Sequence, residues 1–157
     1  MMPEEFKILL VDEDPDLVKV LAIVLRRHGC TVKTALSGSE ALRVFARQSF
    51  EVIIIELTMS GMSGIKLINR IRAIQPAQKI IAISVRPKRC RFWDSTRIPM
   101  PFEGGILDAP DIDCLKKPFK IKHLFELIDK IREPESECNE GIPDNTSRWR
   151  KIRMLLD

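Results

Sequence analysis

The sequence predicts an α/β domain with a doubly wound, five-stranded parallel sheet. Short apolar runs alternate along the chain with amphipathic segments, which is the pattern of strands joined by crossover helices. The apolar runs are continuous rather than alternating, as expected when helices cover both faces of a parallel sheet. No run approaches the roughly 20 apolar residues that a membrane-spanning helix needs.

The predicted strands are short and rich in β-branched residues. They lie at residues 8–11, 30–35, 51–56 and 79–84 and within 113–119. The segments between them place apolar residues three or four positions apart, as amphipathic helices do. The predicted helices cover residues 15–28, 37–48, 63–74 and 120–133.

Capping signals support the first two helices. Asp14 suits the N-cap, Pro15 suits the first helical position, and Gly29 suits the left-handed position after the last turn. Ser37 and Glu40 have the spacing of a capping box. Both helices therefore have a defined start.

Apolar rows support the two later helices. Ile65 and Ile68 lie on one face of the third helix, and Pro76 ends it. Leu124 and Ile128 lie on one face of the last helix. The alternation of strands and helices therefore continues to residue 133.

Polar residues stand where the predicted strands end. Asp12 and Glu13 follow the first strand, Glu56 ends the third, Ser84 ends the fourth and Lys117 follows the fifth. In an open parallel sheet, ligands bind beyond the carboxyl ends of the strands. A single acid there could simply leave the core for solvent. Three acids, a hydroxyl and a lysine at four strand ends indicate a site.

Four ordered segments resemble the receiver domain of two-component response regulators. They are ILLVDEDPDLV, EVIIIELTMSGMSG, IAIS and CLKKPF. These match the family's acidic strand with its first helix, its phosphoacceptor segment, its strand ending in Thr or Ser, and its strand ending in Lys-Pro-Phe. The resemblance covers residues 5–133 and implies a flavodoxin-like fold with strand order 2-1-3-4-5.

The resemblance also implies a Mg²⁺ site, which this chain has either retained or lost. Asp12 and Glu13 would hold the divalent cation, with the Glu56 carboxylate and the backbone carbonyl of Thr58 as further ligands. Hard oxygen ligands of this kind suit Mg²⁺, which keeps several waters.

Glu56 stands at the phosphoacceptor position, where the family carries aspartate. The resemblance makes Ser84 the switch hydroxyl and Lys117 the ammonium that contacts the phosphoryl group. The extra methylene of glutamate advances the carboxylate by roughly 1.5 Å, and a misplacement of about 1 Å can cost about a hundredfold in rate. We therefore expect phosphorylation of Glu56 to be slow or absent. Its charge would instead imitate part of the phosphorylated state.

The acidic residues need a counter-charge. Two carboxylates about 5 Å apart repel each other by roughly 3 kcal/mol at an effective dielectric constant of about 20. Asp12, Glu13 and Glu56 could be neutralised by a cation, by Lys117, or by a proton held with a raised pKa.

Several positions depart from the receiver pattern. Ser60 and Ser63 replace the usual proline and aspartate, and Cys114 stands where the family often has a Tyr or Phe. The segment 86–105 is longer than usual, and its prolines and glycines exclude a long helix. We expect the output surface after the fourth strand to be remodelled.

Basic residues concentrate in segments 86–97 and 147–153, so the rest of the chain is acidic although the net charge is +4. The first segment mixes Arg and Lys with Phe92 and Trp93, as some nucleic-acid contacts do. A solvated loop that packs its aromatics against the domain is the preferred interpretation. Residues 134–157 are predicted to form a linker and a short amphipathic tail.

The cysteine pattern and the amino terminus indicate the compartment. The 4 cysteines are scattered, with no CxxC pair. Metal and redox functions are therefore disfavoured, and reduced thiols of a cytoplasmic protein are expected. The amino terminus lacks the pattern of a secretion signal.

The sequence thus predicts an atypical receiver domain that is not an enzyme and signals by protein–protein contact. Its expected partners are a histidine kinase or a downstream signalling protein, with a homodimer as a further option. The first alternative is a response regulator that accepts a phosphoryl group on Glu56 with Mg²⁺. Binding of a nucleotide or flavin is disfavoured, because DEDPD replaces a glycine-rich phosphate loop after the first strand. Nucleic-acid binding through the basic segments is the remaining alternative.

Overall fold

The computed structural model describes residues 4–85 and 112–133, which contain one parallel sheet of five strands. The strands lie in the order β2-β1-β3-β4-β5, which confirms the predicted order. Their bounds are β1 Phe6–Val11, β2 Cys30–Ala35, β3 Val52–Glu56, β4 Lys79–Ser84 and β5 Asp113–Lys116. The winding reverses between β1 and β3, so the carboxyl ends of these two strands flank the place where such sheets bind ligands.

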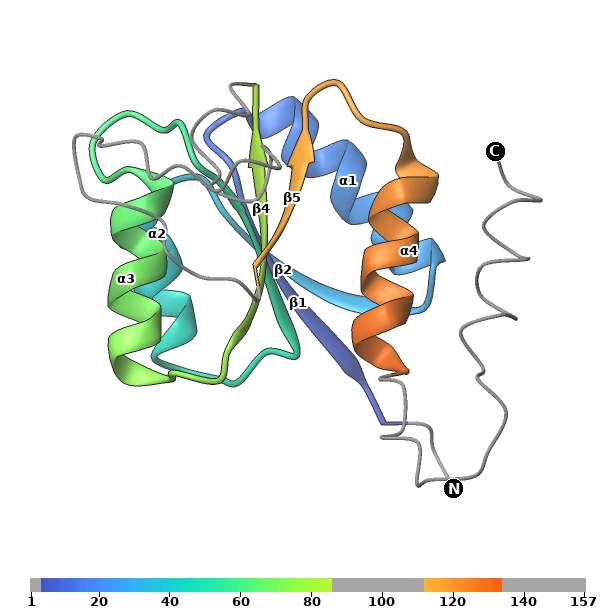
Figure 1. The fold of residues 1–157 in the computed structure, drawn as a ribbon, viewed down its shortest axis with the longest axis horizontal. Coiled ribbons are helices and arrows are strands. Elements are labelled where there is room, and N and C mark those ends of the chain that lie inside the picture. Colours follow the sequence, from blue (N-terminus) through green and yellow to red (C-terminus); the bar gives the residue numbers. More distant parts are fainter. Residues whose placement is uncertain (1–3, 86–111, 134–157) are drawn as a thin grey trace, which may run out of the picture.

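The helices of the described residues cover the sheet in pairs. Helices α2 and α3 lie against one face, and α1 and α4 lie against the other (Figure 1). Their bounds are α1 Pro15–Arg27, α2 Gly38–Phe45, α3 Gly64–Ile74 and α4 Ile121–Arg132. The fold is therefore the doubly wound α/β architecture that the sequence predicts.

The central strand β3 is buried along its whole length. Ile53 and Ile55 belong to the core cluster under α2 and α3, whereas Val52 and Ile54 belong to the cluster under α1 and α4. Successive side chains of a strand point to opposite faces. Both faces of β3 are covered, which explains its unbroken run of apolar residues.

The predicted caps are confirmed. The Asp14 side chain accepts hydrogen bonds from two backbone amides of the first turn of α1, at 3.1 and 3.3 Å. Gly29 has a φ of 86°, the left-handed conformation expected after the helix. At the start of α2, the Ser37 hydroxyl accepts from the Glu40 amide at 3.1 Å. The Glu40 carboxylate accepts from the Leu36 amide at 2.9 Å, one residue before the usual capping-box partner.

Two element boundaries differ from the prediction by two or more residues. Strand β1 begins at Phe6 rather than at residue 8, because Phe6 pairs with Cys30 and is buried there. Helix α2 ends at Phe45 rather than at residue 48. No glycine or proline marks this end in the sequence, so the pattern alone could not locate it.

Some predictions fall on residues that the structure does not describe. The loop at 86–105 and the linker and tail at 134–157 lie outside the described residues, and so do both basic segments. Within 4–85 and 112–133, no helix is long and apolar enough to cross a membrane.

Gly64 begins α3 directly against the end of β3. Its amide donates to the carbonyl of Leu57 at 2.9 Å. A Cβ added at Gly64 would collide with the backbone oxygen of Glu56 and would lie 2.6 Å from the Cα of Leu57. Both obstacles are backbone atoms of a buried strand end, which cannot move aside without cost. The missing side chain of Gly64 therefore helps to place Glu56.

We expect Gly64→Ala to lower the free energy of unfolding by about 2–3 kcal/mol, because the new methyl group overpacks this contact. Urea unfolding followed by circular dichroism measures the change. Gly29→Ala is the matched control. It meets no atom within 4 Å, so it carries only the cost of a left-handed conformation, about 1 kcal/mol. A Gly64→Ala variant no less stable than Gly29→Ala would contradict the contact.

Candidate functional site

The sheet gathers four of the predicted site residues at one end. Val11 pairs with Ile55, and Ser84 pairs with Lys116, so the carboxyl ends of β1, β3, β4 and β5 lie side by side. Asp12, Glu56 and Ser84 are buried there, at 3%, 4% and 3% exposure. Buried charged groups require partners, because burial without them is costly.

Lys117 is the partner of the two buried carboxylates. Its Nζ donates to Oδ2 of Asp12 at 2.6 Å and lies 2.7 Å from Oε2 of Glu56. The second contact is a close ion pair whose angles fall outside those of a hydrogen bond. The Lys117 amide also donates to the Ser84 carbonyl at 2.9 Å, which anchors the residue beside β4. Of the counter-charges considered from the sequence, the structure places Lys117 between Asp12 and Glu56.

Backbone amides complete the coordination of both carboxylates. Oδ1 of Asp12 accepts from the Asp14 amide at 3.0 Å. Oε1 of Glu56 accepts from the Thr58 amide at 2.9 Å. In each buried carboxylate, one oxygen therefore accepts a hydrogen bond from a backbone amide and the other contacts the Lys117 ammonium. This arrangement fixes both side chains.

Glu13 is bonded to Ser60 rather than to the Lys117 ammonium. Its Oε2 accepts from the Ser60 amide at 2.9 Å and from the Ser60 hydroxyl at 2.6 Å. These hydrogen bonds, hydroxyl first, hold the pKa of Glu13 below its usual value. Glu13 is exposed, whereas its neighbour Asp12 is buried. Successive side chains along a strand point to opposite faces. The side chains of Asp12 and Glu13 therefore have different partners although the residues are adjacent in sequence.

The described arrangement does not fit a divalent cation. Within residues 4–85 and 112–133, no three side chains of histidine, cysteine, aspartate or glutamate are grouped closely enough to hold a metal ion. The ammonium of Lys117 lies against Asp12 and Glu56, and Ser60 binds Glu13. The ligand set implied by the family resemblance would require these contacts to change.

The electrostatics of Lys117 follow from its two neighbours. Burial acts to lower the pKa of its ammonium, but the contacts with Asp12 and Glu56 outweigh burial and raise the pKa above its ordinary value. Lys117 is therefore charged throughout the neutral pH range.

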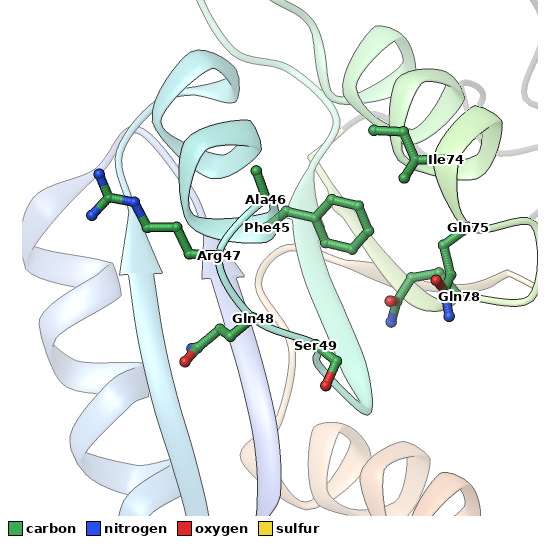
Figure 2. Close-up of a pocket in the computed structure, with 8 residues that line it drawn as sticks. All are labelled: Phe45, Ala46, Arg47, Gln48, Ser49, Ile74, Gln75 and Gln78. Carbon is green, nitrogen blue, oxygen red and sulfur yellow. The ribbon is translucent and has the colours of Figure 1, made fainter.

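A separate pocket of about 490 Å³ opens at the opposite end of the sheet (Figure 2). It lies between the ends of α2 and α3, before β3 and β4. Its lining residues are Phe45, Ala46, Arg47, Gln48, Ser49, Ile74, Gln75 and Gln78. Gln78 donates to the carbonyls of Phe50 and Lys79, at 3.1 Å each, which ties the two loops together. Among the lining residues that the structure describes, Arg47 alone is ionisable, so they include no acid–base pair and no metal ligand set.

Cys114 corrects the expectation of reduced thiols. It lies in β5, packs against the core under α2 and α3, and is disulfide-bonded. Cys30 is free and buried.

Sequence reasoning found the charged centre and missed the partner of Glu13. Asp12, Glu56 and Lys117 are in contact, and Ser84 is buried beside them. Ser60 was noted as a departure from the family pattern, but its bond to Glu13 was not expected. The available signal was chemical, since a serine supplies two donors where a proline supplies none.

The chain is similar in sequence to known proteins. The response regulator receiver domain family matches residues 8–92, slightly more than half of the 157 residues. The transcriptional regulatory protein GlrR of Escherichia coli strain K12 is 30% identical over 144 residues, which cover 92% of this chain and 29% of GlrR. The chain therefore spans less than a third of the length of that relative.

Solved structures show the same fold. The response regulator TrrA of Thermotoga maritima, in complex with Mg²⁺-BeF, superposes with a TM-score of 0.64 and 25% identity. The match covers 80% of this chain and 98% of TrrA. A structure of the histidine kinase ThkA with TrrA contains a chain that superposes with a TM-score of 0.63 at 24% identity, over 82% of this chain and 99% of that one.

We expect Lys117→Met to lower the free energy of unfolding at neutral pH by about 3–5 kcal/mol, because it leaves two buried carboxylates without their counter-charge. Urea unfolding measures this loss. Lys116→Met, at the exposed neighbouring position, is the control and should stay within about 0.5 kcal/mol of the unmodified protein. Equal losses in the two variants would rule out the ion pair as a stabilising contact.

Above neutral pH, the contribution of Lys117 to stability should change only where its ammonium loses its proton. Its pKa is raised above the ordinary 10.5, so the ion pair stabilises fully below that value and is lost as pH rises through the folded pKa. The stability difference between the unmodified protein and Lys117→Met should stay constant from about pH 8 to about pH 10 and then shrink. Chemical unfolding of both proteins across this range tests it, and a difference that shrinks below about pH 10 would contradict the raised pKa.

Proposed function

The chain belongs to the family of response regulator receiver domains, and from this premise we propose that it is an atypical receiver whose state is biased by Glu56. In this proposal Glu56 occupies the phosphoacceptor position and Ser84 is the switch hydroxyl. Lys117 is the cation that pairs with the negative charge at position 56. The domain would signal through protein–protein contact without phosphorylation of an aspartate.

The ion pair between Glu56 and Lys117 carries this proposal. The Glu56 carboxylate is buried, lies 2.7 Å from the Lys117 ammonium and accepts the Thr58 amide. A phosphoryl group on a shorter side chain would offer negative oxygens to the same kind of donors. The longer glutamate reaches Lys117 with its own carboxylate, which supplies about one negative charge where a phosphoryl group supplies roughly 1.5 to 2. Its imitation of the phosphorylated state is therefore partial.

The proposed partners follow from the relatives. The histidine kinase ThkA forms a complex with TrrA, which supports a histidine kinase or a downstream signalling protein as the partner of this chain. The relative GlrR is a transcriptional regulatory protein of which this chain spans 29%. We propose a signalling role for the receiver and no enzymatic activity.

A second candidate is a receiver that accepts a phosphoryl group on Glu56. The structure of TrrA with Mg²⁺-BeF favours it, as does the presence of Ser84 and Lys117 beside Glu56. In this reaction a Glu56 oxygen would attack the phosphorus of a phosphodonor, and the bond from phosphorus to the leaving oxygen would break. The product would be an acyl phosphate, and a Mg²⁺ held by Asp12, Glu13 and Glu56 would require their contacts with Lys117 and Ser60 to change.

Intact mass spectrometry after incubation with acetyl phosphate and Mg²⁺ distinguishes the two candidates. We expect the unmodified protein to stay unchanged, because its carboxylate is misplaced by about one C–C bond for in-line transfer. We expect Glu56→Asp to gain the mass of one phosphoryl group.

Glu56→Gln is the control for labelling elsewhere, and it should stay unchanged. A phosphoryl group on Glu56 of the unmodified protein would overturn the first candidate and establish the second. If Glu56→Asp also stays unchanged, the pocket has lost its transfer chemistry, and the assignment of Glu56 to the phosphoacceptor position has no support.

A further inference from the structure

The loop between β3 and α3 holds Ser60 in one orientation. Met59 is buried in the core under α2 and α3, at 8% exposure. Gly61 has a φ of 73°, a left-handed conformation that side chains other than glycine rarely adopt. Ser60 is exposed between the buried Met59 and the turn at Gly61. Its amide and its hydroxyl both donate to Glu13.

Glu13 is held by two donors of the same residue. The amide and the hydroxyl of Ser60 converge on a single oxygen, Oε2, at 2.9 and 2.6 Å. Hydrogen bonds to a charged acceptor are stronger than those between neutral groups. Glu13 is therefore held against the loop between β3 and α3, while Asp12 contacts Lys117.

We propose that Ser60 is a positioning residue that withholds Glu13 from the carboxylate pocket and so weakens the binding of a divalent cation. Lys117 remains the resident counter-charge of Asp12 and Glu56. A cation that recruits Oε2 of Glu13 must compete with both bonds to Ser60. The inference rests on the proposed function only for the location of the receiver pocket, and it does not depend on whether Glu56 is phosphorylated.

Three substitutions at position 60 separate the two donors. Ser60→Thr keeps the amide and the hydroxyl, Ser60→Ala removes the hydroxyl, and Ser60→Pro removes both, because proline lacks an N–H group. The affinity for a cation should therefore be unchanged in Ser60→Thr, higher in Ser60→Ala and highest in Ser60→Pro.

Isothermal titration calorimetry with Mg²⁺ alone, at constant ionic strength, measures this affinity directly. We expect Ser60→Ala to bind Mg²⁺ about tenfold more tightly than the unmodified protein, since one hydrogen bond to a charged group no longer competes. Ser60→Pro should bind more tightly still. If Ser60→Pro fails to fold, Ser60→Ala with Ser60→Thr still decides the question.

A double-mutant cycle with Glu13→Gln tests whether the effect passes through Glu13. In the Glu13→Gln background the carboxylate is gone, so Ser60→Ala should leave the Mg²⁺ affinity unchanged. Ser39→Ala, at an exposed serine of α2, controls for the loss of a surface hydroxyl. The proposal is overturned if Ser60→Ala binds Mg²⁺ no more tightly than the unmodified protein. It is also overturned if Ser60→Ala gains as much affinity in the Glu13→Gln background.

Discussion

A single ammonium group shared by two buried carboxylates is the constraint on which this end of the molecule depends. Asp12 follows β1 and Glu56 ends β3, which are neighbours in the sheet, whereas Lys117 follows β5 at the sheet edge. Its long side chain must reach past the end of β4, where the residue is the small Ser84. The strand order, the small residue at β4 and the length of lysine are therefore matched to one another. Charges removed from water require such a match, because an unpaired partner would be costly.

The sequence predicted the fold because several local signals agreed. Continuous β-branched runs indicated strands covered on both faces, and Asp14, Ser37 and Gly29 marked helix termini through chemistry that involves only their near neighbours. These signals are local, and the structure satisfies them. The end of α2 lacked such a signal, since Ala46 caps it without a glycine or proline. A helix end that tertiary packing determines is not encoded in the few residues around it.

The sequence predicted which residues form the site but not which contacts they make with one another. The strand ends identified Asp12, Glu56, Ser84 and Lys117, because parallel strands bring their carboxyl ends to one edge. Which counter-charge the acids receive depends on side-chain reach across three strands, so the sequence left a cation, a lysine and a proton as alternatives. The position of Glu13 depends on a turn at Gly61 far along the chain. Long-range contacts of this kind follow from the folded loop and not from residue spacing.

The chain order of the charged centre has a consequence for biosynthesis. Asp12 and Glu56 leave the ribosome well before Lys117, which comes after β5. Strands β1 to β4 can be complete while their two carboxylates still lack an ammonium partner. Until that residue emerges, the acids keep their water and the strand ends stay open. Closure of the charged centre is therefore a late event in synthesis, and a chain released before residue 117 would present hydrated, acidic strand ends in its place.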